Sequence, residues 1–102
     1  MGKNLSVITR TFLSVLQELA NVIREYNSEI TIDYAMVQEV MGSICLFSGN
    51  ISDGTMHFKK AIAIYEVLFE TEPKMIEAKK QEVMEIYAEA GLYIGKNWSE
   101  NR

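Results

Sequence analysis

The chain has 102 residues, enough for one domain, and 48% of them are hydrophobic, which argues against a disordered chain. The net charge is −4 and no Lys or Arg lies between Arg24 and Lys59, so the basic surface that nucleic-acid binding needs is missing. No apolar run is long enough to span a membrane and no secretory signal is recognisable, so we expect a cytoplasmic protein.

The first predicted helix covers residues 5–26. Apolar residues recur there every three or four positions, which predicts that they share one helix face. These residues are Leu5, Ile8, Phe12, Val15, Leu16, Leu19, Ile23 and Tyr26. Asn27 and Ser28 then interrupt the pattern.

Two shorter helices follow, over residues 33–48 and 53–70. Thr31 or Asp33 can cap the start of the earlier one through a side-chain oxygen. Gly49 and Asn50 end it, because both residue types tolerate a left-handed backbone. For the later helix we expect Ser52 as the N-cap.

The fourth predicted helix covers residues 73–94, with Pro73 tolerated in its first turn and Gly95 ending it. The short connections force neighbouring helices to run antiparallel. We therefore expect one all-α domain over residues 1–102, in which four antiparallel helices form two stacked helical hairpins. The ends, 1–4 and 96–102, are expected to be flexible. A plain up-down four-helix bundle is the alternative.

An internal repeat is visible at a period of about 42 residues. The sequence Gln-Glu-Val-Met at residues 38–41 returns at residues 81–84. Gly49 and Gly91, which we expect to close the second and fourth helices, are separated by a similar interval. A helix followed by a helix that ends near glycine thus occurs twice.

Residues 61–68, followed by Glu72 and Pro73, resemble the second helix of a tetratricopeptide repeat. The next helix, with Tyr87, Gly91 and Tyr93, resembles the first helix of that family. The long period is similar to the repeats of kinesin light chains. The resemblance covers residues 16–95, although the tryptophan and the Leu-Gly pair that usually open the first helix are missing.

Tetratricopeptide-like proteins bind peptides or partner helices in a concave surface lined by the first helix of each repeat. In register with the two glycines, the resemblance implies eight groove residues, four on each of the second and fourth helices. They are Glu39, Ser43, Leu46, Phe47, Gln81, Glu85, Ala88 and Glu89. An acidic groove with an apolar floor favours a basic or amphipathic protein segment.

Catalytic or metal-binding patterns are not recognisable. His57 is the only histidine and Cys45 the only cysteine, so neither a His-based metal site nor a Ser-His-Asp set can be assembled. We expect a packed core thiol at Cys45, no cofactor and no enzyme activity. Gly2 fits a loose acylation pattern, and Trp98 stands in the polar tail, where it either caps the last helix or contacts another chain.

The function that these observations favour is that of a protein-interaction module or adaptor. The alternative is a homodimeric helical bundle that acts as a chaperone or regulatory subunit, and an enzyme or small-molecule binder is the third hypothesis. Repeat arrays usually need at least three repeats and polar capping faces. With about two repeats, we expect either self-association or membership of a larger assembly.

Overall fold

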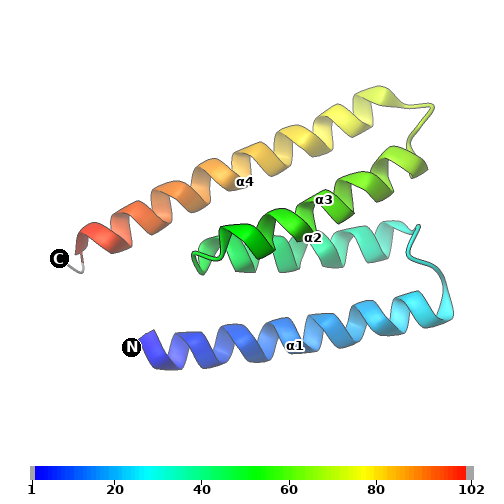
Figure 1. The fold of residues 1–102 in the computed structure, drawn as a ribbon. Helices are drawn as coiled ribbons and strands as arrows, with labels where there is room; N and C mark the ends of the chain where they lie inside the picture. Colours follow the sequence, from blue (N-terminus) through cyan, green and yellow to red (C-terminus); the bar gives the residue numbers. More distant parts are fainter. Residues whose placement is uncertain (1, 101–102) are drawn as a thin grey trace.

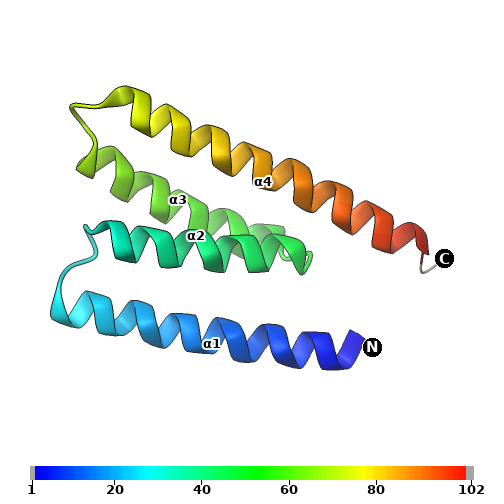
Figure 2. The same ribbon diagram turned by 180° about the vertical axis from the view of Figure 1, so that it is seen from behind.

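A computed structural model of the chain describes the backbone of residues 2–100 and the side chains of residues 7–94. Its secondary structure consists of four helices: α1 (Gly2–Tyr26), α2 (Ile32–Phe47), α3 (Ile51–Leu68) and α4 (Pro73–Glu100). Successive helices run antiparallel, and both views place α2 and α3 between α1 and α4 (Figures 1 and 2). The prediction of an all-α fold with four antiparallel helices is confirmed.

Local side-chain chemistry sets both ends of α2. The hydroxyl oxygen of Thr31 accepts a hydrogen bond from the Tyr34 N–H at 3.2 Å, so Thr31 is the N-cap. At the other end Gly49 adopts φ +87° and donates to the Leu46 carbonyl at 3.0 Å. Asn50 donates to the Cys45 carbonyl at 2.8 Å, which completes a Schellman motif. The predicted stop at Gly49 is confirmed.

The N-terminus of α3 lies two residues earlier than expected. The Asn50 side chain accepts a hydrogen bond from the Asp53 N–H at 3.2 Å and is the N-cap. Our assignment of Ser52 as the N-cap was wrong, because Asn50 already follows the left-handed Gly49 and can restart the helix at once. The α2–α3 connection is therefore very short.

Glycine does not end α4. The helix passes through Gly91 and Gly95 and continues to Glu100, so the expected stop at Gly95, and the closing role given to Gly91, were wrong. Glycine inside a helix costs about 1 kcal/mol relative to alanine but ends a helix only when it turns left-handed. Among the described residues Gly49 alone has a positive φ. The side chain of Trp98 and the acylation pattern at Gly2 lie outside the described side chains.

Helix α2 is at the centre of the packing, because its side chains belong to two buried clusters. One cluster joins α1, α2 and α3 around Ala20, Met41 and Tyr65. The other joins α2, α3 and α4 and consists of Leu46, Phe58, Val83 and Ala90. Its contacts with all three other helices make α2 the element on which the fold depends.

The closest helix pair is α2–α3, and two glycines allow the approach. A β-carbon placed on Gly42 would lie 2.9 Å from the ring of Phe58. One placed on Gly54 would lie 2.8 Å from the Leu46 side chain and 3.1 Å from the Gly42 carbonyl oxygen. Any larger residue at either position would force the two helices apart.

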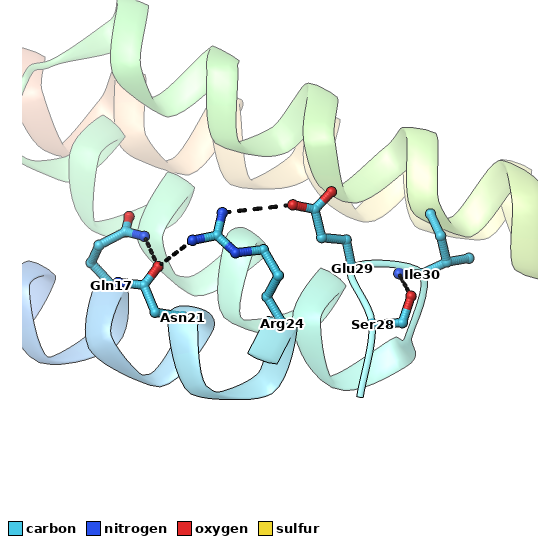
Figure 3. Close-up of polar contacts among 6 residues, drawn as sticks. All are labelled: Gln17, Asn21, Arg24, Ser28, Glu29 and Ile30. Atoms are coloured by element: carbon cyan, nitrogen blue, oxygen red, sulfur yellow. Dashed lines mark hydrogen bonds and ion pairs between the residues drawn. The ribbon is translucent and has the colours of Figure 1, made fainter. Parts of the chain in front are cut away.

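The connection between α1 and α2 is held by polar contacts (Figure 3). The Arg24 guanidinium donates to Asn21 at 3.0 Å and pairs with Glu29 at 3.6 Å. Ser28 accepts a hydrogen bond from the Ile30 N–H at 3.0 Å. These exposed contacts order the turn that returns the chain toward α2.

Candidate protein-binding surface

The four groove positions expected on α2 differ in their accessibility. Leu46 has no exposed surface, because it packs against Gly54 of α3 and against Val83 and Ala90 of α4. Its side chain is a core residue in this structure and does not reach the surface. Helix periodicity alone could not separate this fully buried position from the half-buried Phe47 beside it, because both are apolar residues of the same helix.

Glu39 and Ser43 are half-buried and already take part in internal hydrogen bonds. Glu39 accepts a hydrogen bond from the Tyr65 hydroxyl at 2.5 Å. The Ser43 hydroxyl donates to the Glu39 main-chain carbonyl at 3.0 Å, one turn back on the same helix. The Glu39 carboxylate therefore links α2 to α3 and leaves only part of its surface to a ligand.

Phe47, the fourth position, forms an aromatic pair with Tyr93 of α4. Their ring centroids are 5.4 Å apart and the rings meet edge to face at 62°, an arrangement that the aromatic quadrupole favours. Tyr93 is 43% exposed. Our expected groove set did not include Tyr93, although it lies four residues after Glu89 and thus on the same face of α4.

An open hollow of about 660 Å³ lies beside this aromatic pair. All four helices contribute to it: the first half of α1, the end of α2, the start of α3 and the end of α4. Its walls are more apolar than polar and include Thr9, Arg10, Leu13, Ile44, Cys45, Phe47, Ser48, Asn50, Asp53 and Tyr93. The hollow is large enough to receive one or two side chains of a partner.

The four expected residues of α4, Gln81, Glu85, Ala88 and Glu89, are all exposed. Glu85, Glu89 and Tyr93 follow one another at intervals of four residues, so they form one row along the helix. The row leads from two carboxylates to the aromatic pair at the hollow. Gln81 lies four residues before Glu85 and extends this row. Ala88 lies three residues after Glu85 and borders the row on one side.

The thiol of Cys45, which lines the hollow, is held in an unreactive form. Burial, with a smaller effect of Asp53, raises the pKa of the Cys45 thiol, so the nucleophilic thiolate is disfavoured. His57 lies on α3, where its Nδ1 is 2.7 Å from the buried amide oxygen of Gln38. Within residues 7–94, no three His, Cys, Asp or Glu side chains gather as metal ligands.

None of the described helices is long and apolar enough to cross a membrane. Comparisons of the chain with protein-family models, with curated proteins and with solved structures found no match. The resemblance to tetratricopeptide repeats therefore stays a prediction from the sequence, drawn from the segment 61–68 and the Tyr87–Gly91 spacing. The function must be argued from the surface described above.

Proposed function

We propose that this chain is a cytoplasmic protein-interaction module of the tetratricopeptide-like kind, which binds a basic or amphipathic segment of another protein. The observation that carries the proposal is the open hollow with the Phe47–Tyr93 pair at its edge, in which Phe47 is half-buried and Tyr93 is 43% exposed. Glu85 and Glu89 continue the row along α4. An apolar pocket beside an acidic row matches a ligand with both apolar and basic side chains.

The arrangement of the helices supports this proposal. A concave surface lined by the first helix of each repeat requires α2 and α4 to be neighbours, and they pack against each other through Leu46 and Ala90. The resemblance assigns these same two helices as first helices. Leu46 then contributes to the groove indirectly, as the core residue that packs against α4 and holds it beside α2.

The ligand is expected to make two kinds of contact, one apolar and one ionic. An aromatic or aliphatic side chain would enter the hollow and pack on Phe47, Tyr93 and Leu13, because burial of apolar surface supplies most of the affinity. Lysine or arginine side chains would pair with Glu85 and Glu89, which are exposed, so their contribution should weaken as salt concentration rises.

The decisive experiment reverses the charges of Glu85 and Glu89. The partner is first captured from native lysate and identified by mass spectrometry, and its affinity is then measured by calorimetry at several salt concentrations. We expect Glu85→Lys with Glu89→Lys to weaken binding about tenfold or more and to reduce the salt dependence.

The matched control is Glu66→Lys with Glu70→Lys, which makes the same change in charge at exposed positions of α3 and the turn after it. This control should bind the partner with nearly the affinity of the unaltered chain. Equal affinities and equal salt dependence for the two double variants would refute the proposed surface. A second variant, Tyr93→Ala, tests the apolar part and should weaken binding without changing its salt dependence.

A further inference from the structure

Helix α1 carries an apolar row that no other described part of the chain covers. Six of its side chains are 45–77% exposed. We call this row the α1 seam; it consists of Ile8, Phe12, Val15, Leu19, Val22 and Tyr26. We had expected one stripe on this helix, which would face the core. The structure divides that stripe, because Leu16 and Ile23 pack with Leu13 and Ala20 against α2 and α3 instead.

The spacing within the α1 seam alternates between four and three residues along its whole length. Ile8, Val15 and Val22 recur every seven residues, and so do Phe12, Leu19 and Tyr26. Two apolar positions in each seven residues are the pattern with which one helix packs knobs-into-holes against a second helix. The backbone of α1 runs close to that of α2 alone among the described helices. The α1 seam therefore has the pattern of a helix-pairing surface, and none of the described helices pairs with it.

The α1 seam is turned away from α3. Arg24 lies two residues after Val22 and two before Tyr26, on the opposite side of the helix. It borders a hollow that Lys60 and Val67 of α3 also line, so the Arg24 side of α1 is the one toward α3 (Figure 3).

Helix α2 also has exposed apolar side chains on the side opposite to α3. Gln38 and Gly42 meet His57 and Phe58 of α3. Met36 and Val40 each lie two residues earlier, on the opposite side, and are 52% and 44% exposed. The α1 seam and these two side chains thus lie on the same side of the α1–α2 pair and form one apolar surface across two helices.

We propose that two copies of this chain associate through this surface, with the α1 helix of one copy antiparallel to that of the other. The two-fold axis of such a dimer is perpendicular to the two α1 helices, so Met36 and Val40 of both copies lie on the same side of the contact. Helices α1 and α2 and their counterparts then form a four-helix bundle. A parallel pairing would instead place Glu18 and Glu25 of one copy against Met36 and Val40 of the other. In the antiparallel pairing these carboxylates stay at the edge in water.

The size and the chemistry of the surface suit a second copy. Each half-exposed side chain of the α1 seam offers on the order of 100 Å², so two copies would bury roughly 1,200 Å², the lower end of specific interfaces. The α1 seam contains no charged residue, so it has nothing to pair with the basic segment proposed above. A second copy supplies an identical seven-residue repeat. The inference is independent of the proposed function, which uses α4 and the hollow.

The first test measures mass in solution by sedimentation equilibrium from about 1 to 500 μM. We expect a dimer of the 11.6 kDa chain at the upper concentrations. Phe12→Glu with Val15→Glu should raise the dimer dissociation constant at least about 100-fold. The matched control, Ser14→Glu with Gln17→Glu, adds the same charge to the polar face of α1 and should dimerise like the unaltered chain. A monomeric unaltered chain, or equal association of the two double variants, would overturn the proposal.

The second test uses disulfide formation and leaves the α1 seam largely intact. When the whole α1 seam, residues 8–26, is paired antiparallel, the two-fold axis crosses it near residue 17. Val15 is then displaced from its counterpart by only about 6 Å along the helix, whereas Ile8 is displaced by about 27 Å. Oxidation of Val15→Cys should therefore give a covalent dimer, and oxidation of Ile8→Cys should not. The unaltered chain, whose one thiol at Cys45 is buried, is the baseline. Cross-linking at Ile8→Cys, or none at Val15→Cys, would contradict the antiparallel dimer.

Discussion

The hydroxyl of Tyr65 on α3 donates a hydrogen bond to the carboxylate of Glu39 on α2, at 2.5 Å. The Tyr65 ring is 1% exposed, stacks on Phe69 with centroids 5.8 Å apart, and lies 5.0 Å from the Lys79 ammonium of α4. The Tyr65 side chain thus links its own helix, α3, to α2 and to α4. The bond also orients the Glu39 carboxylate at the edge of the proposed groove.

Replacement of Tyr65 by phenylalanine should lower the free energy of unfolding by about 1–2 kcal/mol, since a hydrogen bond to a charged group is lost while the ring is kept. The cost stays moderate because Glu39 is half-buried and water can replace the phenol. Urea denaturation followed by circular dichroism measures the change. Tyr93→Phe, at a 43% exposed position, is the control and should have little effect.

Alkaline pH should destabilise the fold through the same tyrosine. Burial first, and then the hydrogen bond and negative charge of Glu39, raise the pKa of Tyr65 far above its ordinary value of 10.0. The unfolded chain releases this proton near pH 10 while the folded chain keeps it, so stability is full below pH 10 and is lost as pH rises further. Between pH 9 and 11, roughly one unit on either side of the ordinary tyrosine pKa, the free energy of unfolding should fall less for the Tyr65→Phe variant than for the unaltered chain. Equal slopes would contradict this account.

Acid should destabilise the fold through His57. Burial, and secondarily Lys60, lower the pKa of His57 below its ordinary 6.5, against a smaller opposing effect of Asp53. The unfolded chain therefore takes up a proton first as pH falls. The stability contributed by neutral His57 is present above pH 6.5 and is lost below it.

Replacement of His57 by alanine should remove this pH dependence. It should also cost about 1–3 kcal/mol near neutral pH, because Gln38, only 1% exposed, loses the partner 2.7 Å from its amide oxygen. Thermal unfolding of both chains from pH 5 to 8, about the range in which histidine titrates, measures the two effects. Lys59→Ala, at an exposed neighbouring position, is the control and should change neither quantity.

Replacement of Gly42 by alanine should destabilise the chain by about 1–3 kcal/mol, because the new methyl group would meet the Phe58 ring at 2.9 Å. The same change at Gly91, which is helical and has open space around it, should stabilise the chain by about 0.5–1 kcal/mol. Chemical denaturation of the two variants compares them directly. A stabilising Gly42→Ala would mean that α2 and α3 are not in close contact there.

Replacement of Gly49 by alanine tests backbone conformation alone, since no atom lies within 4 Å of the added β-carbon. The left-handed backbone at φ +87° should cost alanine about 1 kcal/mol. The melting temperature should drop by several degrees. An unchanged melting temperature would show that this turn can adopt another conformation at no cost.

Local chemistry in the sequence was sufficient to predict the four helices and their directions, although it misplaced the start of α3 and the end of α4. Apolar spacing placed all four, the Thr31 oxygen and the left-handed Gly49 fixed the ends of α2, and the short connections required antiparallel neighbours. These features depend on atoms within a few residues of one another, so a single sequence contains them.

Tertiary packing decided which apolar residues are covered. The sequence spacing of Leu46 resembles that of Val15, yet Leu46 is fully buried and Val15 is 61% exposed. Periodicity shows that a helix face is apolar, but only the positions of the other helices show what covers it. For the same reason the hollow beside Phe47 and Tyr93 was not predictable, since its walls come from residues 9–13, 44–53 and 93, three parts of the chain that are distant in sequence and meet only when the fold forms.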